Sequence, residues 1–368
     1  MNSKKHVTLL ISSLKGGGAE KVCVNIANEL ANLGWVVNLI VLNLKNSVYQ
    51  SEVSKKVNLE ELNVAHARYS FLALLRFIYK KKPKIFLVFN YELTIIIILL
   101  RNLFKFKFKV ITRNINTLSE KQKQFDNNWK KKIISFFIKK YYCHADHIIN
   151  QCQSMHDDLI KIYPNIIKNT SVIYNLLDNH FIDFVSSNDL SQIEKKDYLL
   201  CVGRLEKQKA FHYAIEGFSS IAEKFPNLRL KILGEGSLEK ELKQQAYRLG
   251  LVERIDFEGF KKNIIPYYLN ARATLITSIY EGFPNCLIES IKLGTPVLSF
   301  DCPSGPREII VNGINGFLVN YRDMDDFKNK LLTFMESKFY IDKMNTTVKN
   351  HEPKEVAKNY EKLLDSFV

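Results

Sequence analysis

The sequence lacks several features that would assign a protein to a class at once. Its six cysteines are scattered over 368 residues without a Cys-x-x-Cys pair, so neither a disulfide framework nor a zinc site is indicated. Its longest mainly apolar stretch, residues 93–100, is eight residues and includes Thr94, whereas a membrane-spanning helix needs roughly 20. The first apolar run, residues 7–11, is too short for a signal peptide and is typical of a buried strand. We therefore expect reduced thiols and a cytoplasmic location.

Two familiar nucleotide-binding signatures are also missing. The run Gly16-Gly17-Gly18-Ala19-Glu20 follows the first expected strand and opens a helix, but it has no Gly-Lys-Ser/Thr ending. It does not match Gly-x-Gly-x-x-Gly either, so ATP hydrolysis and NAD binding are both disfavoured. Three glycines there would let the backbone approach a phosphate or sugar at the positive end of a helix. A simple tight turn between strand and helix is the alternative interpretation.

Positive charge is concentrated in the first half of the chain. Residues 1–175 contain 27 Lys and Arg against 11 Asp and Glu, whereas residues 176–368 contain 26 against 27. This asymmetry indicates an anionic partner of the first half, such as a phospholipid surface or a phosphorylated substrate. Nucleic acid would also fit the charge, but no nucleic-acid-binding motif accompanies it, and none is expected as a partner.

Short apolar runs alternate with helical patterns in both halves, which predicts parallel, doubly wound sheets. The expected fold is α/β, with two Rossmann-like domains facing each other across a cleft. Domain boundaries are expected at residues 1–175, 176–352 and 353–368, the last a helix that returns to the first domain. The expected strands are residues 7–12, 36–42, 85–89, 110–112, 147–150, 198–202, 229–233, 255–257, 273–276 and 297–300, and the expected helices include 19–33, 211–225, 238–249 and 353–367.

The strongest chemical signal is a pair of glutamates, Glu281 and Glu289, on either side of Gly282-Phe283-Pro284-Asn285. Proline is suited to the first turn of a helix, so Glu281 should lie on the entering loop and Glu289 just over one turn inside. Both carboxylates would then lie near a positive helix end that suits a phosphorylated ligand. Two solvated glutamates on an ordinary surface helix are the alternative.

Further candidates follow other strands of the second half. Arg204 and Lys209 come after residues 198–202 and could clamp a diphosphate, although two exposed basic residues in a loop would look the same. Gly234, Gly259 and Phe260 follow the next two strands. In open α/β sheets this edge, at the carboxyl ends of the strands, is where ligands bind.

Taken together, these motifs resemble the large retaining glycosyltransferase family known as GT4, whose members have the GT-B fold. The resemblance covers nearly the whole chain. It implies that Arg204 and Lys209 bind the donor diphosphate, that Glu281 contacts the donor sugar and that Glu289 contacts the ribose. It implies a wider donor site of Gly17, Gly18, Gly234, Gly259, Phe260, Phe283, Pro284, Asn285 and Leu287. The segment from Asp301 to Glu308 is similar to bacterial surface-polysaccharide enzymes, some of which transfer N-acetylgalactosamine or related hexoses.

One position departs from the family pattern. Many members have a histidine after a first-domain strand, near the acceptor, whereas this chain has Arg113 and Asn114 there. We treat both as acceptor-side candidates. The resemblance implies front-face attack with retention of configuration, in which the departing phosphate takes the acceptor proton. Lys209, Arg204 and the backbone of Gly16–Gly18 would stabilise the leaving charge, and no metal or cofactor is then expected.

A membrane contact is predicted in Lys121–Tyr142, where aromatic residues recur at helical spacing among lysines. A core-facing helix with a solvated lysine face has the same pattern. The resulting hypothesis is a peripheral inner-membrane hexosyltransferase. It would use a nucleotide sugar, with UDP favoured, and a lipid-linked or polysaccharide acceptor. A nucleotide-sugar 2-epimerase of the same fold and a non-catalytic binding protein are the alternatives.

Overall fold

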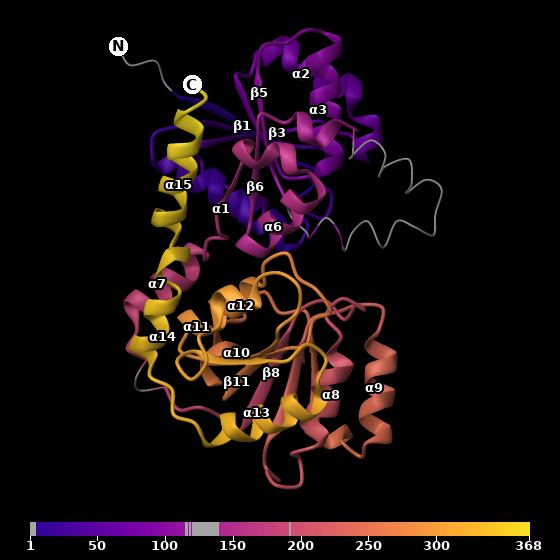
Figure 1. Cartoon of the computed structure of the whole chain (residues 1–368), viewed down its shortest axis with the longest axis vertical. Helices are drawn as coiled ribbons and strands as arrows, with labels where there is room; N and C mark the ends of the chain where they lie inside the picture. Colours follow the sequence, from indigo (N-terminus) through magenta and orange to yellow (C-terminus); the bar gives the residue numbers. More distant parts are fainter. Residues whose placement is uncertain (1–4, 115–116, 118, 120–139, 191–192) are drawn as a thin grey trace. The chain divides into compact units, whose positions relative to one another are not determined.

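The computed structural model describes residues 5–114, 117, 119, 140–190 and 193–368. Its contacts divide the chain into two compact units, Met1–Asp178 with His351–Val368, and Asn179–Asn350. The chain therefore leaves the first unit after Asp178 and returns to it for its last helix (Figure 1). No helix among the described residues is long and apolar enough to cross a bilayer.

The first unit contains a seven-stranded parallel sheet in the order β3-β2-β1-β4-β5-β6-β7. Because β1 lies between β2 and β4, the strand order reverses beside it, and this is the doubly wound arrangement. Inner strands such as β4 are buried at every position, which is why they have unbroken apolar sequences. The strands are β1 (His6–Ile11), β2 (Val36–Val41), β3 (Val57–Glu61), β4 (Ile85–Val88), β5 (Lys109–Arg113), β6 (His147–Asn150) and β7 (Thr170–Val172).

Helices cover both faces of this sheet. On one face α1 (Gly18–Asn32) packs against α15 (Pro353–Asp365), whose Val356, Tyr360 and Leu364 are buried in the same apolar cluster. On the other face lie α2 (Phe71–Lys81) and α3 (Tyr91–Leu103) (Figure 1). Their buried side chains form a second cluster with Leu10 and Phe86. A further helix, α6 (Gln153–Ile162), follows β6. The last helix of the chain is therefore part of the core of the first unit.

The second unit contains a six-stranded parallel sheet in the order β10-β9-β8-β11-β12-β13. Its order reverses between β8 and β11, which pair directly. The strands are β8 (Tyr198–Val202), β9 (Arg229–Leu233), β10 (Ile255–Gly259), β11 (Ala273–Ile276), β12 (Val297–Phe300) and β13 (Gly316–Val319). The helices are α7 (Asn179–Ser187), α8 (Phe211–Ser219), α9 (Glu239–Arg248), α10 (Ile265–Asn270), α11 (Asn285–Lys292), α12 (Pro306–Ile309), α13 (Met324–Glu336) and α14 (Ile341–Thr347).

The predicted fold class, two doubly wound α/β units, is confirmed, with local corrections. The edge strands β3 and β13 and the three-residue β7 were not predicted, because short or partly polar edge strands lack a long apolar run. The predicted helix at 211–225 ends at Ser219, where the Ser219 and Ser220 hydroxyls bond to carbonyls three residues earlier. Most of the predicted membrane helix Lys121–Tyr142 lies outside the described residues.

Candidate active site

Two loops meet where the strand order of the second unit reverses. The loop after β8 carries Lys209, and the loop after β11 carries Glu281. Because β8 and β11 are neighbouring parallel strands, their carboxyl ends lie side by side at one edge of the sheet. There the Lys209 ammonium donates a hydrogen bond to Glu281 Oε1 at 2.6 Å. The structure thus brings Lys209 and Glu281 into contact, although they are 72 positions apart and were predicted separately as donor-site residues.

The Glu281 carboxylate is held from several sides. It is 5% exposed, and the Ser278 hydroxyl donates to the same Oε1 at 2.6 Å. Its backbone N–H donates to the carbonyl of Pro303, so the 301–308 segment lies against this loop. Burial alone would lower the pKa of Lys209, but its electrostatic and hydrogen-bonding interactions, those with Glu281 foremost, together outweigh burial and raise the pKa above its usual value. Lys209 therefore keeps a positive charge at neutral pH.

Glycine is required at two points around this pair. Gly234 has φ +131°, and a Cβ on it would lie 1.9 Å from the carbonyl oxygen of Gly203. The loops after β9 and β8 can therefore touch only without a side chain there. Gly305 has φ +98°, and its Cβ would lie 2.4 Å from Pro284 Cδ. The loops after β8 and β9 are thus closely packed, and the loop after β12 packs against Pro284 at the entrance to α11.

Helix α11 carries the second glutamate. Pro284 precedes the helix as its cap rather than standing in its first turn, and Glu289 is the fifth helical residue. The Tyr268 hydroxyl, from α10, donates to Glu289 Oε2 at 3.1 Å. Burial, together with the charge of Glu289, raises the pKa of Tyr268 far above its usual value, so the phenol remains a donor. Tyr268 also meets Phe181 of α7 edge-on, with ring centroids 6.5 Å apart.

The other donor-side predictions fall at the same sheet edge with different exposures. Arg204 and Phe260 are exposed, and the carbonyl of Gly259 accepts a hydrogen bond from the N–H of Gly234 at 2.9 Å. Phe283 and Leu287 are buried, so their side chains pack in the protein and only their backbone could face a ligand. Asn285, the first residue of α11, is partly exposed.

The remaining predicted residues belong to the first unit. Gly17 caps α1 and Gly18 begins it, beside the end of β1. Arg113 ends β5 and is 1% exposed, and its guanidinium donates to the Tyr360 hydroxyl at 2.7 Å and to the Asn175 side chain. Among the described residues, Arg113 Nη1 has no hydrogen-bond partner. Asn114, which follows, donates to Asn150 Oδ1 at 3.2 Å.

Sequence reasoning assigned no role to Ser278, Tyr268 or Asn90. Ser278 lies inside the glutamate segment, and its spacing of three residues from Glu281 was the available signal. Tyr268 lies 21 residues before Glu289, and no motif links them. Asn90 accepts a hydrogen bond from the Ser12 N–H at 3.0 Å, at the point where the sheet order of the first unit reverses.

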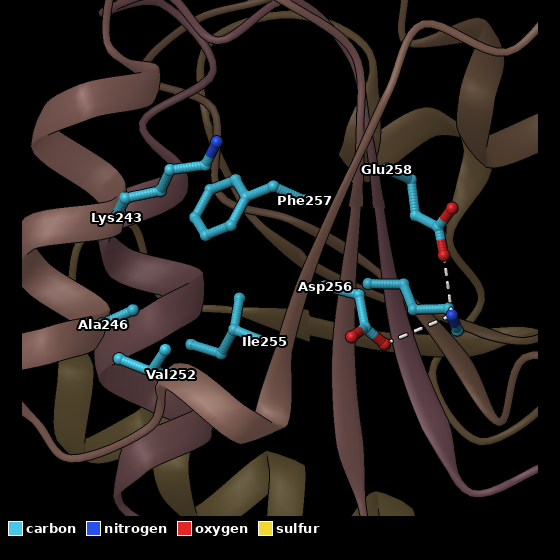
Figure 2. A pocket seen from close by; sticks show the side chains of 8 residues that line it. Lys243, Ala246, Val252, Ile255, Asp256, Phe257 and Glu258 are labelled. Carbon is cyan, nitrogen blue, oxygen red and sulfur yellow. Dashed lines mark hydrogen bonds and ion pairs between the residues drawn. The ribbon is translucent and has the colours of Figure 1, made fainter.

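A separate hollow of about 580 Å³ lies on the edge strand β10 and on α9 (Figure 2). On one side Lys243 Nζ lies 5.4 Å from the centre of the Phe257 ring. On the other side Asp256 and Glu258 both pair with Lys231, and hydrogen bonding to Arg229 is the main cause that lowers the pKa of Asp256. None of the predicted site residues lines this hollow. Its paired charges are typical of an edge strand protected from further pairing.

No group of three or more His, Cys, Asp or Glu side chains suited to a metal occurs among the described residues. Cys286, beside the Lys209–Glu281 pair, is not a reactive thiol at neutral pH, because burial raises its pKa to about 12.

Two family models match the chain almost end to end. Residues 16–181 match the model described as Glycosyltransferase Family 4, and residues 185–355 match the model described as Glycosyl transferases group 1. A Campylobacter jejuni N-acetylgalactosamine-N,N'-diacetylbacillosaminyl-diphospho-undecaprenol 4-alpha-N-acetylgalactosaminyltransferase is 28% identical, covering 97% of this chain and 98% of that protein. The amylovoran biosynthesis glycosyltransferase AmsD of Erwinia amylovora is 25% identical, covering 89% of each chain.

Solved structures agree with the fold. The crystal structure of Anabaena HepE in complex with UDP-glucose has a TM-score of 0.77 at 17% identity, covering 98% of this chain and 99% of that one. With the paired carboxylates and the Lys209 contact at the sheet edge, the family matches lead to one conclusion. The chain belongs to the GT4-type glycosyltransferases of the GT-B fold.

Proposed function

We propose that this glycosyltransferase moves a hexose or N-acetylhexosamine from a UDP-sugar to a lipid-linked saccharide, with retention of configuration, at the inner face of a membrane. The observation that carries the proposal is the buried contact between Lys209 and Glu281 at the reversal of the sheet. It puts a permanent cation and a fixed carboxylate at the edge where α/β sheets bind ligands.

The chemistry assigned to these groups is leaving-group stabilisation. In the transfer, the acceptor oxygen forms a bond to the anomeric carbon while the bond to the diphosphate oxygen breaks. Lys209 and the exposed Arg204 would neutralise the charge that develops on the diphosphate, which takes up the acceptor proton. Since these two residues supply positive charge, we propose that no metal ion is needed.

The two glutamates would act on different parts of the donor. Glu281, fixed by Lys209 and Ser278, would accept hydrogen bonds from hydroxyls of the transferred sugar. Glu289, oriented by Tyr268, would accept them from the ribose. Preference for UDP is supported by HepE, which was crystallised with UDP-glucose. A lipid-linked acceptor is supported by the diphospho-undecaprenol named in the Campylobacter relative and by the excess of positive charge in residues 1–175.

Calorimetry tests the donor site first. We expect the full chain to bind UDP more tightly than GDP or ADP, and Glu289→Gln to weaken UDP binding at least tenfold. Glu241→Gln, an exposed glutamate on α9, is the matched control and should bind as the wild type does. Equal binding of UDP by the wild type and by Glu289→Gln would contradict the assignment of the ribose site.

Turnover separates the transferase from its alternatives. With labelled UDP-sugars and an undecaprenyl-diphosphate-linked saccharide, we expect label to enter the lipid fraction, and Lys209→Met to abolish this without abolishing UDP binding. An altered UDP-sugar formed without acceptor would indicate an epimerase. Binding of UDP without any product from a panel of UDP-hexoses and acceptors would favour a non-catalytic protein.

A further inference from the structure

Large apolar side chains lie on the outer side of α2 and at the end of α3. Helix α2 buries Leu74, Phe77 and Ile78 in the core. On its other side Leu72 and Tyr79 are 62% and 56% exposed, and they are seven residues apart, so they share one helix face. At the end of α3, Leu103 is 66% exposed and Phe104 is 40% exposed. Exposed apolar groups gathered in this way mark an interaction surface.

The aromatic side chains of these two segments contact one another. The Tyr79 ring centre lies 6.3 Å from that of Phe104 and 5.2 Å from that of Phe106. The rings of Phe104 and Phe106 are stacked, with centres 5.9 Å apart. The apolar patch is therefore Leu72, Tyr79, Leu103, Phe104 and Phe106. Its aromatic part is one cluster built from the end of α2 and the chain after α3, in which Tyr79 and Phe104 are exposed and Phe106 is partly buried.

Basic residues flank the patch in the sequence. Residues 65–109 contain ten Lys and Arg but a single acidic residue, Glu92. Within the part of the chain that the structure describes, the neighbouring Lys81 and Lys109 pair with Glu60 and Asp146. The exposed lysines without an ion pair among those residues form the basic rim: Lys80, Lys82, Lys84, Lys105 and Lys107.

We propose that the apolar patch docks this unit on an anionic phospholipid bilayer, with the aromatic rings entering the interface and the basic rim contacting lipid phosphates. Aromatic rings and lysines are the side chains that favour this boundary. The inference rests on the proposed function, which requires an acceptor in a membrane. A second copy of the chain would fit less well, because a two-fold contact would bring the same lysines together. Nucleic acid would match the charge but not the exposed leucines.

Vesicle co-sedimentation of the full chain tests the proposal. The wild type should bind vesicles of phosphatidylglycerol and phosphatidylcholine and should not bind phosphatidylcholine alone. Tyr79→Ser/Phe104→Ser and Lys80→Gln/Lys82→Gln/Lys105→Gln should each lower the partition coefficient at least tenfold. Tyr247→Ser/Lys240→Gln is the matched control, because α9 also exposes a tyrosine and a lysine. It should bind vesicles as the wild type does.

A second measurement distinguishes insertion from adsorption. The emission of Tyr79→Trp should shift to the blue on vesicles and be quenched by brominated lipid. Loss of binding in the lysine variant alone would overturn the role of the apolar patch. Undiminished binding in both variants, or a dimer that only Tyr79→Ser/Phe104→Ser dissociates, would overturn the proposal.

Donor binding is followed separately, so that failure here is not confused with failure of the proposed function. Every variant should retain wild-type affinity for UDP and a wild-type thermal midpoint. If the wild type binds vesicles through the patch but transfers no sugar, the docking surface would be supported and the proposed reaction would be contradicted. If the Tyr79→Ser/Phe104→Ser and lysine variants bind vesicles as the wild type does and still transfer sugar to a lipid-linked acceptor, the proposed reaction would stand and this docking surface would be excluded.

Discussion

Removing either member of the Lys209–Glu281 pair should destabilise the protein more than neutralising both. The side chains are 17% and 6% exposed, and the Nζ–Oε1 distance is 2.6 Å. Lys209→Met removes the ammonium from beside the buried Glu281 carboxylate, while the Ser278 hydroxyl still donates to that carboxylate at 2.6 Å. Breaking a buried pair by removing one partner typically costs about 3–5 kcal/mol, because a charge is left buried without its counter-ion.

The double variant Lys209→Met/Glu281→Gln removes both charges and keeps side chains of similar volume. Replacing a buried pair by neutral groups is often close to neutral. We therefore expect the double variant to lose about 2 kcal/mol or less, which with single losses of about 3 kcal/mol or more each gives a coupling free energy of at least about 4 kcal/mol in a double-mutant cycle. Its sugar-transfer activity should still be abolished, because leaving-group stabilisation needs the ammonium.

Urea unfolding followed by circular dichroism provides the free energies, with the m-values checked for constancy across the four proteins. The exposed pair Lys243–Glu239 on α9 is the control, and its cycle should give about 0.3–0.5 kcal/mol. Single losses at Lys209 and Glu281 that simply add in the double variant would refute the reasoning. Both charges would then be solvated, and the pair could not hold Glu281 in place.

Three other perturbations have defined outcomes. Tyr268→Phe should weaken UDP binding about tenfold by calorimetry, since a hydrogen bond to the Glu289 carboxylate contributes about 1.5 kcal/mol. Tyr360→Phe should lower the free energy of unfolding by about 1.5–3 kcal/mol in urea, because Arg113 Nε loses its acceptor. His351 is buried, and burial lowers its pKa. On acidification the unfolded chain therefore binds a proton at this residue more readily than the folded chain does. The contribution of neutral His351 to stability should be fully present above about pH 6.5 and should be lost on acidification. In thermal melts, His351→Asn should therefore reduce the fall of the midpoint with decreasing pH.

The parts of the fold that follow from local sequence were predictable. β8, β11 and β12 have the predicted limits, because strands buried on both faces are nearly continuous apolar runs with turn residues after them. β9 also has its predicted limits, although Arg229 and Lys231 alternate there with buried apolar residues. The unpredicted strands β3, β7 and β13 are short or partly polar. The serines that end α8 do so through hydrogen bonds to carbonyls, which composition does not reveal. The loops that hold the predicted donor residues were predicted for the same reason, since each directly follows a buried strand.

The contacts within the site were less predictable, because they depend on which strands are neighbours. Lys209 and Glu281 were each assigned to the donor, but their mutual contact exists because β8 pairs with β11. Tyr268 reaches Glu289 from a separate helix, and no spacing rule connects a tyrosine on α10 with a carboxylate on α11. Sequence motifs therefore predicted Lys209, Glu281 and Glu289 as site candidates, but not Ser278 and Tyr268, which bond to the two carboxylates.

Arg113 was predicted as an acceptor-side residue, but its side chain is buried and bonds to residues that are distant in the sequence. It ends a strand, as an acceptor-side residue should, but its partner Tyr360 lies 247 positions away on α15. It also bonds to the Asn175 side chain, while the carbonyl of Asn175 contacts His351 Nδ1 at 2.9 Å. These contacts tie β5 to both segments at which the chain leaves and re-enters the first unit.

A substitution at Arg113 would therefore disturb the core of the first unit whether or not the residue meets an acceptor. Asn114 is the sharper test of the acceptor side, because its amide donates to Asn150 within the same sheet edge and to neither crossing segment. A loss of transfer in Asn114→Ala, with UDP affinity and the thermal midpoint unchanged, would point to acceptor binding. The same loss in Arg113→Lys would carry that meaning only if the unfolding free energy were also unchanged.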